Sequence, residues 1–112
     1  MAEFELRTYA DEQGRVPFET WILELDRQAQ AKVTIALSRL ERGNMSNVEA
    51  VGEGVSELKL NWGPGYRVYF GQDGRTNIIL LCGGTKKRQG RDIAAAKVQW
   101  ANYKLRRSAI PR

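Results

Sequence analysis

Hydrophobic and polar residues alternate at the start of the chain and predict a first strand. Phe4, Leu6 and Thr8 alternate with charged residues, so one face of this strand is expected to be buried. The polar residues 11–14 that follow end in a glycine and predict a turn. The chain is therefore expected to open with a short strand that turns sharply into the next element.

Apolar residues then recur at helical spacing in two segments, 18–25 and 33–40. This spacing predicts two amphipathic helices. Pro17 suits the first turn of the first helix, Asp26 can cap the second helix, and Gly43 can end it. Because each helix has one apolar face, we expect the two to pair as an antiparallel hairpin.

The second half of the chain predicts three strands. Residues 44–54 are polar and contain glycine, which indicates a loop. Beyond it, Val55 to Leu60 has the pattern of a strand, Tyr66 to Phe70 is aromatic and β-branched, and Thr76 to Cys82 is the most apolar segment. The residues from Gly71 to Gly74 end in Asp-Gly and predict a hairpin turn between the last two strands.

A final helix, predicted from Asp92 to Leu105, completes the order β-α-α-β-β-β-α. This order predicts an α+β fold, with an antiparallel sheet and the helical hairpin packed on one face. The first strand is expected at an edge or beside the last strand. We interpret residues 1–112 as one domain, since a chain of this length buries enough surface for a single core.

Charge is unevenly distributed along the chain. Lys and Arg number 18 and Asp and Glu 13, which gives a net charge of +5 and a pI near 9.7. From Lys59 onward the only acids are Asp73 and Asp92, so the positive excess lies in the C-terminal half. This excess favours an anionic partner, most plausibly RNA.

The composition argues against several other classes of protein. Histidine is absent and Cys82 is the only cysteine, so neither a zinc site nor an internal disulfide is expected. Cys82 lies in an apolar run and is interpreted as a buried reduced thiol. The longest apolar run, Ile78 to Cys82, is too short to span a membrane, and no signal peptide is evident. We therefore expect a cytoplasmic protein with no metal, no cofactor and no membrane partner.

The candidate site is formed by cations around the last two strands. Strand alternation places Arg67 and Tyr69 on one face, and the expected hairpin brings Arg67 and Lys86 into one shallow site. Gly83-Gly84 predicts a turn with φ > 0 at which backbone can approach a ligand. The residues after it can hold phosphates: Thr85, Lys86, Lys87 and Arg88. The GxxxxGK[ST] pattern is absent, which argues against hydrolysis of a nucleoside triphosphate.

RNA cleavage fits such a site because RNA carries its own nucleophile, the 2′-hydroxyl. Fixed cations stabilise the charge that develops on the phosphate, and Lys86 or Asp92 would move the proton, a choice that the residues leave open. Asp92 is alternatively interpreted as the cap of the final helix. The further candidate contacts to RNA phosphates and bases are Lys59, Tyr69, Lys87, Arg88 and Arg91, and Trp62, Tyr66 or Tyr69 can stack on an unpaired base.

Three segments carry a resemblance to a known family: GPGYRVYF (63–70), LLCGGTKKRQGRDI (80–93) and the AKVQW helix after them. They resemble the RelE/HigB-like toxins of type II toxin–antitoxin modules, in the branch of addiction-module killer proteins related to phage-derived proteins. The resemblance extends over essentially the whole chain. It implies a RelE-like fold and an endoribonuclease, an mRNA interferase, that cuts mRNA on the ribosome. It also implies a helix-turn-helix antitoxin of the HigA type, and it assigns contacts with the scissile phosphate to Arg67 and Lys86, supported by Lys87 and Arg88.

The chain departs from the RelE and HigB patterns at two points. Asp92 stands, by approximate alignment, near the position of the catalytic tyrosine of RelE, and the catalytic histidine of HigB has no counterpart. Two other functions stay open at this stage: a ParE-like toxin that inhibits DNA gyrase, and a non-catalytic RNA-binding module. Arg67 together with the cluster at Lys86 favours the ribonuclease.

Overall fold

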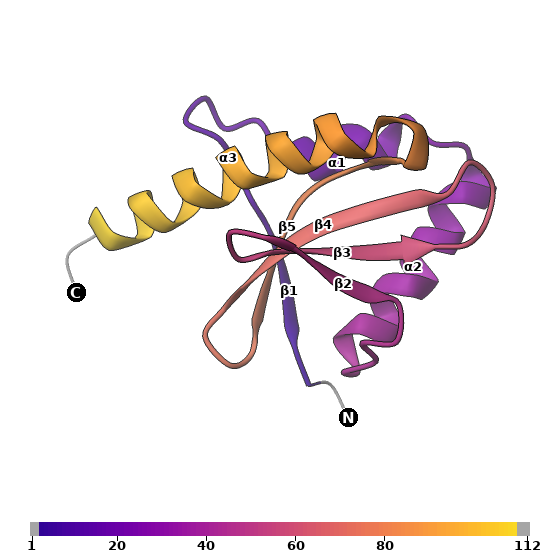
Figure 1. Ribbon diagram of the computed structural model, residues 1–112, viewed down its shortest axis with the longest axis horizontal. Coiled ribbons are helices and arrows are strands. Elements are labelled where there is room, and N and C mark those ends of the chain that lie inside the picture. The colour runs from indigo at the N-terminus through magenta and orange to yellow at the C-terminus, as the bar shows by residue number, and fades with distance from the viewer. Residues whose placement is uncertain (1–2, 110–112) are drawn as a thin grey trace.

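The computed structural model describes residues 3–109. Its elements are, in chain order, β1 (Glu5–Thr8), α1 (Pro17–Leu23), α2 (Arg27–Glu41), β2 (Val48–Gly52), β3 (Val55–Leu60), β4 (Tyr66–Asp73), β5 (Asn77–Thr85), the 3₁₀ turn η1 (Lys86–Arg88) and α3 (Gln89–Ala109). The strands form one mixed sheet in the order β1-β5-β4-β3-β2. Figure 1 shows the twisted sheet, with the long helix α3 running across it and α2 lying beside the ends of β3 and β4.

The structure has the α+β fold expected from the sequence, consistent with a RelE-like arrangement. Strands β3, β4 and β5 form the antiparallel meander, and β1 joins the sheet at its edge, parallel to β5. Pro17 opens α1. Asp26 caps α2 as predicted, because its Oδ1 accepts a hydrogen bond from the amide of Ala29 at 2.8 Å.

One strand was missed, and the observed order is β-α-α-β-β-β-β-α. Strand β2 lies within residues 44–54, which the sequence analysis interpreted as a loop. It pairs antiparallel with β3 and forms the second edge of the sheet. Its side chains are exposed or half-buried, and Val48 and Val51 pack at the margins of different core clusters, so β2 has no single buried face by which to recognise it. Its turn into β3 places Glu53 and Gly54 at positive φ.

Helices cover both faces of the sheet and create two hydrophobic layers. One layer packs the hairpin of α1 and α2 on the sheet through Phe18, Val33, Leu40, Leu58, Leu60, Val68, Phe70, Ile78 and Leu80. The other packs α3 on the opposite face through Tyr9, Val55, Tyr69, Ile79, Leu81, Cys82, Ala96 and Trp100. Successive residues of the central strands therefore enter opposite layers, and both are buried.

Three element boundaries differ from the predictions. Strand β4 extends to Asp73, so Gly71 lies within the strand and the turn is formed by residues 74–76. Strand β5 continues through Gly83 and Gly84 to Thr85. Helix α3 begins at Gln89 rather than at Asp92. In the described part of the chain, residues 3–109, no helix has the length and apolar character needed to cross a membrane.

Candidate functional site

Arg67 and Lys86 line the same shallow concavity. Antiparallel pairing of β4 and β5 places Arg67 opposite Gly84, and the chain reaches Lys86 two residues later. The amide of Lys86 donates a hydrogen bond to the carbonyl of Gly65 at 2.8 Å, which ties η1 to the loop between β3 and β4. The concavity has a volume of about 400 Å³ and is lined by Asn61, Trp62, Gly63, Pro64, Gly65, Arg67 and Lys86. The proximity of Arg67 and Lys86 agrees with the hairpin predicted from the sequence.

The Arg67 side chain is held in place rather than solvated, with only 6% of the residue exposed. Its Nη1 donates hydrogen bonds to the carbonyls of Gly65 at 3.2 Å and Tyr66 at 3.3 Å. Its Nε lies 3.8 Å from Oε2 of Glu57 on β3, an ion pair too long for a hydrogen bond. The guanidinium is therefore fixed between a loop backbone and a carboxylate, with one side at the concavity.

Glu57 is the residue that the sequence analysis missed. It is fully buried, and its Oε2 accepts a hydrogen bond from Nε2 of Gln89, at the start of α3, at 2.6 Å. Among residues 3–109, its Oε1 and the Nε of Arg67 have no hydrogen-bond partner. Glu57 shares its strand face with the apolar Val55 but also with Lys59, so the sequence pattern alone did not mark this face as buried. A buried carboxylate on that face needs a cation, and Arg67 supplies it.

Tyr69 does not have the position expected of an RNA contact. Its side chain has no exposed surface and lies beneath α3, so its ring cannot stack on a base. Burial, and next to it the charge of Glu57, raises the pKa of the Tyr69 hydroxyl far above its usual value. Tyr69 is therefore a core residue of the layer under α3.

Asp92 lies in the first turn of α3. Because the helix begins at Gln89, Asp92 is not its N-cap, and the capping interpretation was wrong. A carboxylate in this turn is still favoured by the helix dipole. Oδ2 of Asp92 is buried and has no hydrogen-bond partner among the described residues. Desolvation raises the pKa of Asp92, and the charges of Arg88 and Arg91 oppose that shift.

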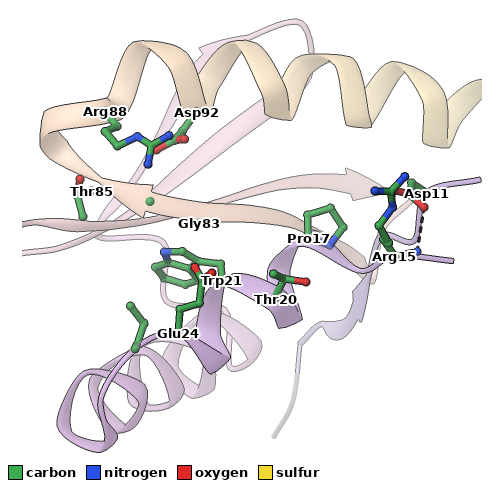
Figure 2. Close-up of a pocket in the computed structure, with 12 residues that line it drawn as sticks. Asp11, Arg15, Pro17, Thr20, Trp21, Glu24, Gly83, Thr85, Arg88 and Asp92 are labelled. Carbon is green, nitrogen blue, oxygen red and sulfur yellow. Dashed lines mark hydrogen bonds and ion pairs between the residues drawn. The ribbon is translucent and has the colours of Figure 1, made fainter. Parts of the chain in front are cut away.

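Gly83 and Gly84 do not form the predicted turn, because both lie in β5 and neither has a positive φ. A Cβ at Gly83 would lie 2.3 Å from the ring of Trp21 on one face of the strand. On the other face, a Cβ at Gly84 would lie 1.8 Å from Oδ2 of Asp92. The pair therefore makes room for two side chains. Figure 2 shows Trp21 of α1 on one side of β5 at Gly83, with Asp92 and Arg88 of the α3 region on the other.

A second concavity of about 530 Å³ lies where α1, the end of β5 and the start of α3 meet, and we call it the Asp92 groove. It is lined by Asp11, Arg15, Pro17, Thr20, Trp21, Glu24, Leu25, Gly83, Gly84, Thr85, Arg88 and Asp92 (Figure 2). Neither Arg67 nor Lys86 lines it. The three candidate catalytic residues thus lie in two adjacent concavities, Arg67 with Lys86 in one and Asp92 with Arg88 in the other.

The remaining candidate cations surround these concavities. Lys87, Arg88 and Arg91 are exposed in η1 and the start of α3. Lys59 lies opposite Arg67 in the sheet register and forms an ion pair with Glu49. The predicted cluster Lys86-Lys87-Arg88 therefore lies at the surface, while Lys59 is partly neutralised.

Cys82 is buried and unpaired, as predicted. Burial, with a smaller effect from the charge of Asp92, raises the pKa of its thiol to about 12. A thiol in this environment stays protonated and is a poor nucleophile. Within residues 3–109, no three His, Cys, Asp or Glu side chains gather as a metal site would require.

Comparison with known proteins now adds to this geometry. Residues 20–105 match the family described as phage derived protein Gp49-like (DUF891). An uncharacterized protein of Haemophilus influenzae (strain ATCC 51907 / DSM 11121 / KW20 / Rd) is 39% identical over 82 residues, which cover 72% of this chain and 83% of that protein. The chain belongs to the Gp49-like family.

Gp49-like proteins are a toxin-like family of toxin–antitoxin systems. Membership therefore implies an antitoxin as partner. The matched residues run from α1 to α3 and include Arg67, Lys86 and Asp92. The region with the candidate site is thus part of what this chain shares with the family.

Proposed function

We propose that this chain is the toxin of a type II toxin–antitoxin module and that it inhibits translation by cutting mRNA on the ribosome, in the cytoplasm. The observation that carries the proposal is the meeting of Arg67 and Lys86 in one concavity of a Gp49-like protein. A fixed guanidinium at the base of the concavity and the exposed ammonium of Lys86 together suit a phosphate of an RNA backbone. The activity is assigned to residues 1–112 as one toxin domain.

The proposed reaction uses the nucleophile of the substrate. The 2′-hydroxyl gives its proton to solvent as its oxygen attacks the adjacent phosphorus, and the bond from phosphorus to the 5′-oxygen of the next nucleotide breaks. The products are a 2′,3′-cyclic phosphate and a 5′-hydroxyl. Negative charge grows on the non-bridging oxygens in the transition state, and Arg67 and Lys86 stabilise it. Because two carbonyls and Glu57 already orient Arg67, little reorganisation is needed when the charge develops.

Proton transfer is assigned to Lys86 in this proposal. Its ammonium can give a proton to the leaving 5′-oxygen, since Lys86 lines the same concavity as Arg67. Asp92 has the raised pKa that suits proton transfer, but its carboxylate lies over Gly84 in the adjacent groove. Asp92 therefore lies beside the site, over Gly84, while Lys87, Arg88 and Arg91 contact flanking phosphates.

The partner antitoxin is proposed to be a helix-turn-helix protein of the HigA type that covers the concavity of Arg67 and Lys86. An antitoxin bound there would neutralise the basic surface and would exclude RNA from the concavity. Lysine-directed chemical labelling of the free toxin and of its purified complex tests this placement. Lys86 should lose its reactivity in the complex while Lys104, on the exposed face of α3, keeps it. Full reactivity of Lys86 in the complex would contradict it.

Purified ribosomes carrying a defined mRNA test the reaction. The wild type is compared with Arg67→Ala, Lys86→Ala and the control Arg75→Ala, which removes an exposed cation in the turn between β4 and β5. Wild type and Arg75→Ala should cut the mRNA, mapped by primer extension, and the two site variants should cut it about 100-fold more slowly. Folded wild-type protein that leaves the mRNA intact would contradict the proposal, as would site variants that cut at the wild-type rate.

A further inference from the structure

The surface beside the concavity of Arg67 and Lys86 contains another depression, which we call the Lys32 groove. It has a volume of about 240 Å³ and lies between α2 and the loop that joins β3 to β4. Figure 1 shows that loop next to α2. Asn61 and Trp62 line both the Lys32 groove and the concavity of Arg67 and Lys86. The two depressions therefore adjoin at Asn61 and Trp62.

Trp62 is held at this junction by its neighbours. Its ring stacks on Tyr66, with 6.1 Å between ring centroids and 27° between ring planes. Tyr66 in turn meets the edge of Trp21 at 6.1 Å. The Nζ of Lys32 lies 5.6 Å from the centre of the Trp62 ring. Trp62 is half-buried, so it presents a rigid aromatic surface next to a cation.

The cations of the Lys32 groove are unevenly compensated. Lys59 is paired with Glu49. Lys32 and Arg39, by contrast, form no ion pair within residues 3–109. The side chain of Lys32 is long and flexible, so its ammonium can leave the tryptophan ring and meet a phosphate. An aromatic platform beside two uncompensated cations is the combination that binds single-stranded nucleic acid.

We propose that the Lys32 groove is a second RNA subsite. It holds single-stranded RNA next to the segment bound at Arg67 and Lys86, with a base stacked on Trp62 and phosphates paired with Lys32 and Arg39. An unpaired strand is required because bases within a duplex have no free face for the tryptophan. The proposal rests on the proposed function, since it extends the same RNA beyond the site of cleavage.

Fluorescence anisotropy with labelled RNA tests the subsite. The probe is a single strand of about 12 nucleotides, long enough to cover both depressions, and its 2′-O-methyl groups prevent cleavage. Lys32→Ala/Arg39→Ala is compared with Arg75→Ala/Lys104→Ala, which removes the same charge far from the groove. The first pair should weaken binding at least tenfold and make the negative slope of log K against log salt less steep by about 1.4. The control pair should leave binding within about twofold, because its cations contact no phosphate.

A second pair of variants separates stacking from charge. Trp62→Ala should weaken binding roughly tenfold, while Trp62→Phe should recover most of the loss because a ring remains. Thermal unfolding of each variant shows whether it is folded. The second subsite would be overturned if Lys32→Ala/Arg39→Ala and Arg75→Ala/Lys104→Ala lost the same RNA affinity, or if the wild type did not bind the probe.

Failure of the second subsite is distinguishable from failure of the proposed function. The ribosome assay depends on Arg67 and Lys86, and cleavage there stands even if the Lys32 groove binds nothing. One outcome would rule out the subsite alone. In that outcome the wild type binds the probe, Arg67→Ala/Lys86→Ala weakens the binding, and the groove variants leave it unchanged. If the groove variants weaken binding and the ribosome assay shows no cleavage, the groove binds RNA in a protein that does not cut it.

Discussion

Nε of Arg67 lies 3.8 Å from the carboxylate of Glu57, and both side chains are almost fully buried. Arg67, the cation at the centre of the proposed site, therefore pairs with a carboxylate of strand β3 inside the protein. This pairing fixes the direction of the guanidinium. It also means that the stability of the fold and the geometry of the site depend on the same two residues.

Replacing Glu57 should destabilise the protein strongly. Glu57→Ala leaves Arg67 buried without its carboxylate, which costs about 3–5 kcal/mol of unfolding free energy. Urea unfolding measures this, with Glu49→Ala as the matched control. Glu49 pairs with Lys59 at the exposed edge of the sheet, so its loss should cost far less unfolding free energy than the loss of Glu57. Similar losses for the two variants would show that the buried pair contributes little.

Gly84→Ala should be destabilising because its Cβ has no room beside Asp92. Overpacking of this kind costs about 1–3 kcal/mol. Gly90→Ala is the control, since in the described structure nothing lies within 4 Å of a Cβ at that position; in a helix that change should be neutral or stabilising. Removing the Asp92 carboxylate by Asp92→Ala should relieve much of the Gly84→Ala penalty. Additive effects in this double-mutant cycle, followed by thermal unfolding, would contradict the close contact.

The raised pKa of Asp92 predicts a pH-dependent difference between the wild type and Asp92→Asn. The folded protein binds the proton more tightly than the unfolded chain does, so ionisation of Asp92 disfavours folding. As pH rises above the ordinary Asp value of 3.8, the wild type should lose stability relative to the variant. The difference in unfolding free energy between the two proteins should then level off once the Asp92 carboxyl is ionised in both the folded and the unfolded state. Urea unfolding of both proteins between about pH 3.5 and 7 measures it.

Glu49 supplies a control of opposite sign. A hydrogen bond from Lys59, together with its charge, lowers the pKa of Glu49. Its contribution to stability should therefore be present above the unfolded pKa and be lost as pH falls through the folded pKa. Glu49→Gln should thus become less stable relative to the wild type as pH rises. If both variants changed in the same direction with pH, the assignment for Asp92 would not hold.

Local signals in the sequence were sufficient to predict most of the helices and strands. The apolar run of β5, the Asp26 cap and Pro17 at the start of α1 each depend on neighbouring residues only, and each was predicted. Strand β1 lies at an edge of the sheet and beside β5, which are the two placements that the sequence left open. Strand β2 was missed because an exposed edge strand resembles a polar loop in sequence.

The errors in the site have a different cause, which is packing between distant segments. A glycine pair looks the same whether it supplies a positive φ or clears space, and the residues that need the space at Gly83 and Gly84 lie in α1 and α3. Glu57 was interpreted as part of an ordinary alternating strand because nothing local shows that α3 covers that face. Tyr69 was misplaced for the same reason. The positions of Arg67 and Lys86 were predictable because a single hairpin relates them.

The most direct measurement is induced expression of the wild type, Arg67→Ala and Lys86→Ala in a bacterium, with growth and the 5′ ends of mRNA mapped in the same cultures. The account predicts growth arrest by the wild type with new cuts inside translated codons. Both variants should allow growth and produce no cuts, and the amount of folded protein is measured for each, because Arg67→Ala also removes the partner of the buried Glu57. Growth arrest with intact mRNA and damaged DNA would contradict the account and favour inhibition of gyrase, and cuts that persist in both variants would place the reaction at another site.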